Sequence, residues 1–201
     1  MRLDSVLRCE GLAIERGGRT LATGLTLDLA PGARGLVLGA NGSGKSTLAA
    51  GLCGLLPLRA ARLERPARIG YAPQEPDFPG ARRCREYLRE LAALGGAGRS
   101  AAAQADAALR LFALEEMSRH RISELSRGWR QRLNLARAWL GRPALVILDE
   151  PQTALDPDGF AALGRALILA DQAVLLVAPP GAGCEALAPP ILRLGQETAT
   201  R

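Results

Sequence analysis

The sequence is short of the residue types that build several kinds of functional site. Aromatic residues make up 3% of its 201 residues, and it contains a single histidine, His120, and a single lysine, Lys45. With few rings to stack on bases, the net charge of +6 favours solvated arginine side chains, and we expect no nucleic-acid partner. The four cysteines form no C-x-x-C pair and lack a neighbouring histidine, so no zinc site is predicted and reduced, mostly buried thiols are expected.

Long apolar runs are also missing. Charged residues interrupt every apolar stretch before it reaches the roughly 20 residues that span a bilayer, and residues 1–5 lack the apolar core of a signal peptide. We therefore expect a chain that does not itself cross a membrane. Its length and its 48% hydrophobic content suffice for one core with a subordinate helical lobe, which predicts a single domain over 1–201.

A glycine-rich stretch at 39–46 surrounds the only lysine and fits the pattern G-x-x-x-x-G-K-[ST] directly after an apolar run. Glycines let successive backbone N–H groups turn toward a polyphosphate, and the helix that follows directs its positive dipole end at the same charge. An ordinary Gly/Ser turn is the alternative, but the spacing around a single lysine favours a phosphate-binding loop. The predicted nucleotide contacts are Gly39, Ala40, Asn41, Gly42, Ser43, Gly44, Lys45, Ser46 and Thr47.

Apolar patterns around this loop predict the first half of the fold. Residues 6–14 and 25–29 have the short apolar patterns of strands joined by a turn, and 36–38 is a further strand. A helix is expected from Lys45 to Pro57, with Leu48, Leu52 and Leu55 or Leu56 at helical spacing. A strand at 69–72 then runs into Pro73-Gln74, and a helical lobe is predicted over about 76–128, with a break at 95–98.

The second half contains two carboxylates at the tip of a predicted strand. Ser126 is a plausible N-cap for a helix that runs to Leu140, where residues 141–143 stop it. The apolar run 144–148 is typical of a buried parallel strand and ends in Asp149-Glu150. In a nucleotide site Asp149 would hold Mg²⁺ and Glu150 would polarise the attacking water, whereas the bland alternative is a polar turn.

Together these motifs resemble the ATP-binding cassette (ABC) ATPases that power membrane transporters, and the similarity covers nearly the whole chain. The combination of Ser126-x-Gly128, residues 130–133, residues 136–138 and 148–151 is highly specific. The order of motifs also matches: 39–46 resembles the Walker A loop, Gln74 the Q-loop, 125–129 the signature, 145–150 Walker B, and 153–156 the D-loop.

The resemblance implies an α/β fold with a P-loop nucleotide-binding core, an N-terminal antiparallel β subdomain and an inserted α-helical lobe. It implies ATP and Mg²⁺ as ligands, Ser46, Gln74 and Asp149 as metal contacts, and Glu150 as the catalytic residue. ATP would lie between the phosphate loop of one copy and Ser126 and Gly128 of a second nucleotide-binding subunit, in a homodimer or a heterodimer. The partners would be transmembrane permease subunits, and the location would be cytoplasmic, peripheral on the inner face of the cell membrane.

Three departures from the family pattern stand out. After the strand 173–177, where the family places a histidine that contacts the γ-phosphate, the sequence reads Ala178-Pro179-Pro180, which predicts slower hydrolysis. His120 lies before the signature and is expected to be a solvated residue near a helix end. Arg127 and Trp129 replace the usual glycine and glutamine of the signature. Arg16 replaces an aromatic residue, although a guanidinium plane can also stack on adenine.

Several functions remain open from the sequence. The short link from Pro57 to Ile69 and residues 135–140 resemble the small cassette of the haem exporter used in cytochrome c maturation, or a related export cassette. A degenerate ATP-binding regulatory subunit with little hydrolysis, paired with an active cassette, is an alternative suggested by Pro179 and Arg127. A cassette acting on DNA or ribosomes is disfavoured, because such relatives generally carry paired cassettes or long coiled-coil insertions.

Overall fold

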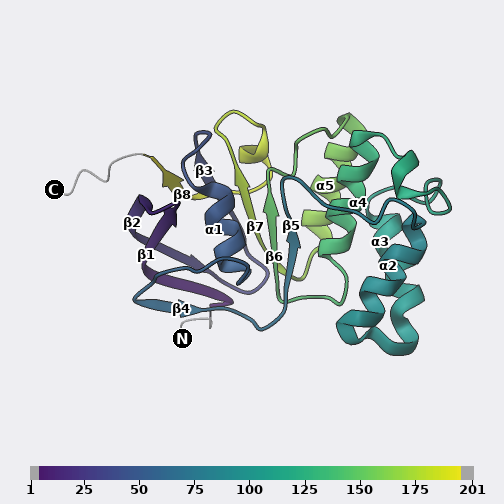
Figure 1. The fold of residues 1–201 in the computed structure, drawn as a ribbon, viewed down its shortest axis with the longest axis horizontal. Helices are drawn as coiled ribbons and strands as arrows, with labels where there is room; N and C mark the ends of the chain where they lie inside the picture. Colours follow the sequence, from purple (N-terminus) through teal and green to yellow (C-terminus); the bar gives the residue numbers. More distant parts are fainter. Residues whose placement is uncertain (1–4, 196–201) are drawn as a thin grey trace.

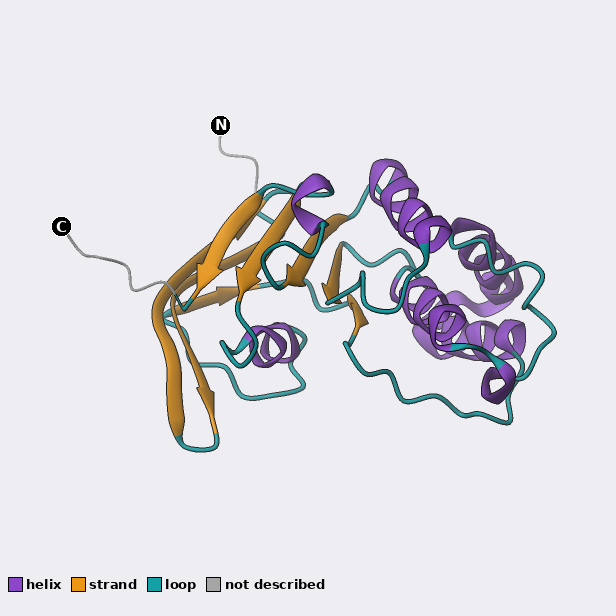
Figure 2. Cartoon of the chain, turned by 90° about the horizontal axis from the view of Figure 1, so that it is seen from above, coloured by secondary structure: helices purple, strands orange, loops and turns teal. Residues whose placement is uncertain are grey.

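The computed structural model describes residues 5–195, which form two β-sheets and a group of helices. Figure 1 shows the smaller sheet at one end, the helices α2–α5 at the other, and the larger sheet between them; Figure 2 shows the same separation from above. Residues 1–4 and 196–201 lie outside the description, so the expectation about a signal peptide falls mostly outside it. The assignment of 1–201 to one domain stays a prediction.

The smaller sheet is antiparallel, with the strand order β2-β1-β4. It contains β1 (Leu7–Arg16), β2 (Arg19–Leu29) and β4 (Arg62–Glu64). Gly17 and Gly18 both have positive φ angles, 56° and 76°, and make the tight turn between β1 and β2 that the sequence predicts. Gly11 lies where the β1–β2 register shifts, so that Leu12 and Ile14 remain buried on the core side.

The larger sheet is parallel throughout, with the order β5-β6-β7-β3-β8. Its strands are β3 (Arg34–Gly39), β5 (Ile69–Ala72), β6 (Leu145–Asp149), β7 (Ala173–Ala178) and β8 (Pro190–Leu194). The central strands β6 and β7 are buried along their whole length, as expected for continuous apolar runs covered on both faces. Because the strands are parallel, their carboxyl ends share one edge, where ligands bind in such folds.

The larger sheet separates two hydrophobic cores. Leu36, Leu38 and Leu176 face the core formed with α2 (Cys84–Ala92), α3 (Ala101–Leu111), α4 (Arg127–Ala138) and α5 (Pro157–Leu169). Val37 and Leu175 face the other core, which contains α1 (Lys45–Leu52) and the smaller sheet. The alternation of neighbouring residues between the two cores follows from the two-residue repeat of a strand. The predicted α/β class with an antiparallel sheet is therefore confirmed.

Several predicted boundaries are wrong. The helix that begins at Lys45 ends at Leu52 rather than near Pro57, because Gly54 adopts a left-handed conformation with φ 79°. Leu55 and Leu56 consequently lie outside the helix and are 65% and 45% exposed. The strand β8 and the helix α5, which Asp156 caps through the Gly159 amide, were not predicted.

The break predicted at 95–98 is present. The π-helix η1 (Ala93–Ala97) and the short 3-10 helix η2 (Gly98–Ser100) separate α2 from α3, and Gly96 and Gly98 have positive φ angles. Two other 3-10 turns are η3 (Ile122–Glu124) and η4 (Cys184–Ala186). Across residues 5–195, every helix falls short of the length or the apolar character needed to traverse a bilayer.

Gly70 of β5 packs closely against the C-terminal end of α4. A Cβ atom built on Gly70 would lie 1.8 Å from the Ala138 carbonyl oxygen, which is backbone and has no room to move. We predict that Gly70→Ala lowers the free energy of unfolding by about 1–3 kcal/mol, measured by chemical denaturation. Gly164→Ala in α5 is the control: its Cβ would meet only Leu187 at 3.6 Å, so a gain of about 0.5–1 kcal/mol is expected. Equal stabilities for the two variants would contradict this packing.

Candidate functional site

The glycine-rich loop joins the carboxyl end of β3 to α1. Gly42 and Gly44 have φ angles of 81° and 96°, and Gly44 caps α1 by accepting a hydrogen bond from the Leu48 amide at 2.8 Å. A Cβ on Gly44 would lie 2.8 Å from Ile14 Cγ2, and a Cβ on Gly39 would lie 2.4 Å from Ser43 Oγ. Glycine is therefore required at both positions by the space available, as well as by the backbone angle at Gly44.

The Lys45 side chain lies between the glycine-rich loop and Glu150. Its side chain is 4% exposed, and its Nζ donates a hydrogen bond to the Ala40 carbonyl oxygen at 3.0 Å and lies 3.6 Å from Glu150 Oε1. The ammonium group thus compensates its burial with a carbonyl and a carboxylate. A cavity of about 230 Å³ opens here, and it is lined by Arg16, Asn41, Gly42, Gly44, Lys45, Ser46, Thr47, Gln74 and Glu150.

Asp149 ends the buried strand β6 and is 1% exposed. Burial raises its pKa from 3.8 to about 6; the Ser46 hydroxyl and the Lys45 charge lower the pKa, and the Glu150 charge raises it. Within residues 5–195, its Oδ1 has no hydrogen-bond partner. A buried, unpaired carboxylate oxygen beside a serine hydroxyl is an arrangement that fits a hard divalent cation such as Mg²⁺.

Glu150 has a left-handed backbone, with φ 48°, which is unusual for a residue other than glycine. Its amide donates to the Val177 carbonyl oxygen at 2.8 Å, which fixes the turn against β7. Its Oε2 accepts a hydrogen bond from Gln74 Nε2 at 3.1 Å, while Oε1 faces Lys45. The strand register explains why Gln74 and Glu150 are close: Ala72 of β5 pairs with Leu148 of β6, so the segments that follow these two strands leave the sheet side by side.

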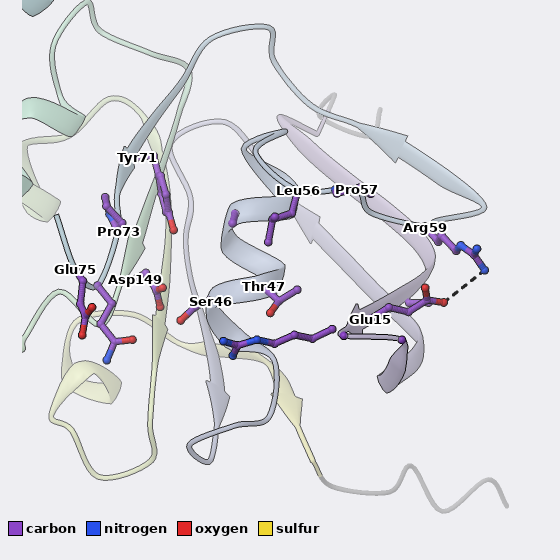
Figure 3. A pocket seen from close by; sticks show the side chains of 16 residues that line it. Glu15, Ser46, Thr47, Leu56, Pro57, Arg59, Tyr71, Pro73, Glu75 and Asp149 are labelled. Atoms are coloured by element: carbon purple, nitrogen blue, oxygen red, sulfur yellow. Dashed lines mark ion pairs between the residues drawn. The ribbon is translucent and has the colours of Figure 1, made fainter. Parts of the chain in front are cut away.

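A larger cavity of about 740 Å³ shares the lining residues Arg16, Ser46, Thr47 and Gln74 with the smaller one, so the two lie side by side. Figure 3 shows Ser46 and Asp149 on one side of it and Leu56, Pro57 and Arg59 on another. Sequence reasoning missed these last three, together with Glu15, Tyr71 and Glu75, which also line it. An ion pair between Arg59 and Glu15, at 3.5 Å, closes one rim.

Ser126 and Gly128 are not among the residues that line either cavity. They lie at the start of α4, where Ser126 Oγ accepts the Trp129 amide at 3.3 Å, as expected of an N-cap. A Cβ on Gly128 would lie 3.0 Å from the Ala154 carbonyl oxygen, so this segment abuts the predicted D-loop of the same chain. The structure thus brings together Arg16, the loop 39–47, Gln74, Asp149 and Glu150, and leaves Ser126 and Gly128 apart from them.

Beside the loop, β7 ends at Ala178, paired with Leu38 of β3, and Pro179 follows. His120 lies two residues before η3 and is exposed, in agreement with the expectation that it is solvated. Cys9, Cys84 and Cys184 are buried free thiols, as expected, and Cys53 is half-buried.

A parallel α/β sheet with a glycine-rich loop after one strand and paired carboxylates at the tip of another is characteristic of phosphate-loop nucleotide-binding proteins. Comparison with known proteins gives the family. The family model described as "ABC transporter" matches residues 22–153, more than half of the chain. The chain therefore belongs to the ABC transporter family.

Curated relatives and a solved structure agree with this assignment. The zinc import ATP-binding protein ZnuC of Cereibacter sphaeroides is 37% identical over 163 residues, covering 80% of this chain and 65% of that protein. The cytochrome c biogenesis ATP-binding export protein CcmA of Alcanivorax borkumensis is 37% identical over 173 residues, covering 84% and 78%. A structure titled "Structure of ATP binding subunit of ABC transporter" is 25% identical, with a TM-score of 0.81, covering 94% and 88%. The chain spans 51% to 65% of the length of the zinc import proteins that it matches.

The raised pKa of Asp149 predicts a stability that depends on pH. Between about pH 4 and pH 6 the folded state holds a proton that the unfolded state has lost, so the Asp149 contribution to stability falls as the pH rises through this window and stays low above it. In the metal-free and nucleotide-free protein, Asp149→Asn should raise the free energy of unfolding at pH 7 by up to roughly 3 kcal/mol and have little effect near pH 4.

Denaturant titrations at the two pH values measure this difference. Asp158→Asn, an exposed position in the first turn of α5, is the control and should show no such gain. A variant at 149 that is no more stable than the native chain at pH 7 would be inconsistent with a buried, uncompensated carboxylate.

Proposed function

We propose that this chain is the ATP-binding and ATP-hydrolysing subunit of an ABC transporter, acting at the cytoplasmic face of the membrane with transmembrane permease subunits and a second nucleotide-binding subunit. The observation that carries the proposal is the meeting of Lys45, Gln74 and Glu150 around the smaller cavity, beside the larger cavity that Asp149 and Gln74 line.

In this proposal the loop 39–47 and the start of α1 bind the phosphates of ATP, with Lys45 leaving Glu150 to reach the terminal phosphate. Ser46, Gln74 and Asp149 would hold Mg²⁺, which supplies positive charge to the phosphate oxygens when bound. Glu150 accepts a proton from the attacking water, and the Gln74 amide orients its carboxylate. Arg16 would stack its guanidinium on the adenine, and its position in the lining of both cavities supports this role.

Ser126 and Gly128 would contact ATP bound to the second subunit, which is consistent with their absence from this chain's own cavities. Hydrolysis would be slower than usual for the family, because Pro179 offers no hydrogen-bond donor to the γ-phosphate. The cargo is proposed to be that of an export cassette for cytochrome c biogenesis. In support, the chain covers 74% and 78% of two CcmA proteins, more than of the zinc import proteins.

The second candidate is a regulatory subunit that binds ATP, hydrolyses little and is paired with an active cassette. It is favoured by Pro179 in the histidine position and by Arg127, which is exposed at the start of α4 where the family has glycine. The two candidates share the nucleotide site and differ in whether turnover depends on Glu150 of this chain.

Lys45→Ala tests nucleotide binding. Loss of a charge-assisted contact to phosphate should weaken the affinity for Mg·ATP by about 10-fold to 100-fold, measured by isothermal calorimetry. Arg142→Ala removes an equal charge from an exposed ion pair with Asp171 and should leave the affinity unchanged. Absence of any heat with the native, folded chain would overturn the proposal.

Glu150→Gln tests hydrolysis. Removal of the proton acceptor should lower the turnover number by about 100-fold while ATP is still bound, because the amide keeps the size of the side chain. Glu116→Gln, an exposed position after α3 that lines neither cavity, is the control and should retain most of the activity. If turnover measured with a partner cassette survives Glu150→Gln in this chain, the regulatory candidate replaces the first.

A further inference from the structure

The helix α4 buries three polar side chains, Gln131, Arg132 and Asn134, within about one turn. Gln131 and Arg132 are each 4% exposed, and Asn134 is fully buried. Arg132 lies over the Trp129 ring, 4.4 Å from its centroid, and is hydrogen-bonded to Asp156. Gln131 and Asn134 line neither cavity, so the burial of these two polar side chains needs a separate explanation.

Gln131 and Asn134 form a continuous relay of hydrogen bonds. Asn134 Nδ2 donates to the Pro73 carbonyl oxygen at 2.8 Å and to Gln131 Oε1 at 3.2 Å. Gln131 Nε2 in turn donates to the Pro151 carbonyl oxygen at 3.1 Å. The relay therefore connects the peptide unit that precedes Gln74 with the peptide unit one residue beyond Glu150.

The contact between Gln74 and Glu150, at 3.1 Å, closes this relay into a ring. One side of the ring consists of the Gln74 and Glu150 side chains, and the opposite side consists of α4. Resting on the proposed hydrolysis of ATP, we infer that Gln131 and Asn134 are positioning residues, which set the separation of Gln74 and Glu150 by holding the backbone of both loops on one rigid helix.

A purely structural role explains these side chains less well. Leu133, Leu135 and Ala136 of the same helix are fully buried and already supply its apolar contacts with the core. Asn134 Oδ1 is buried and has no hydrogen-bond partner among the described residues, which is a cost to stability that an apolar residue of similar size would avoid. An apolar residue could not replace Asn134, because it would lack the Nδ2 group that donates to both Pro73 and Gln131.

The kinetic test uses Asn134→Leu, which keeps the approximate volume and removes the donor. We expect the turnover number to fall about tenfold while the KM for ATP changes less than about twofold. In a Gln74→Ala background the same substitution should have no further effect, since it acts through Gln74. Leu135→Ala, a neighbouring core change, is the control: its effect should be the same in both backgrounds. If Asn134→Leu lowers the turnover number by the same factor in the native and the Gln74→Ala backgrounds, the inference is overturned.

A second measurement does not depend on catalysis. In the nucleotide-free chain, Asn134→Leu and Gln131→Met should each increase amide hydrogen exchange about tenfold in residues 74–76 and 150–153, which include the Glu150 and Thr153 amides. Leu135→Ala, compared at equal global stability, should not increase it there. Unchanged exchange in both relay variants would overturn the inference, and either variant suffices if the other does not fold. The proposed function fails separately: if the two variants loosen these loops but the native chain neither binds nor hydrolyses ATP, the proposed function is rejected while the relay itself is confirmed.

Discussion

The approach of Lys45 to Glu150 at the carboxyl edge of the parallel sheet is the constraint on which the site depends. The 4%-exposed ammonium group needs compensation, and the Ala40 carbonyl and the Glu150 carboxylate provide it. Ala40 and Lys45 belong to the segment that joins β3 to α1, Glu150 follows β6, and β7 separates the two strands. The interaction therefore ties the glycine-rich loop to the tip of β6 and places both beside Gln74.

The same edge contains groups that reduce stability in the absence of a ligand. In the part of the chain that the structure describes, Asp149 Oδ1 and Ser43 Oγ are buried without hydrogen-bond partners, and Glu150 has a left-handed backbone. Each of these features costs of order 1–3 kcal/mol in an ordinary protein. Two continuous cores on either side of the sheet offset these costs, because the central strands bury apolar side chains on both faces. A bound cation and phosphates would compensate the same groups directly, which links ligand binding to stability.

Much of this arrangement could be predicted from the sequence, because local patterns specify it. The spacing around Lys45 indicated the loop, the apolar run before Asp149 indicated a buried strand, and Ser126 was a recognisable N-cap. The roles of these residues toward a nucleotide stay predictions. The end of α1 was wrong because leucine spacing continued past the left-handed Gly54. The residues Leu56 and Arg59 carry no local signal, since their place in the larger cavity arises from the folding of the chain between α1 and β4.

The relay through α4 shows what sequence patterns do not contain. Gln131 and Asn134 occupy polar positions of an amphipathic helix and suggest a solvated face, whereas both are buried on carbonyl groups from two distant loops. This support has particular weight in a chain with Pro179 at the end of β7, beside the strand that leads into the glycine-rich loop. Without a histidine there, the orientation of Glu150 depends on Gln74, Lys45 and the turn fixed to Val177. A bound triphosphate would attract the Lys45 ammonium group and so break its contact with Glu150. The position of the Glu150 carboxylate would then depend mainly on Gln74 and on the attachment of the Gln74 backbone to α4.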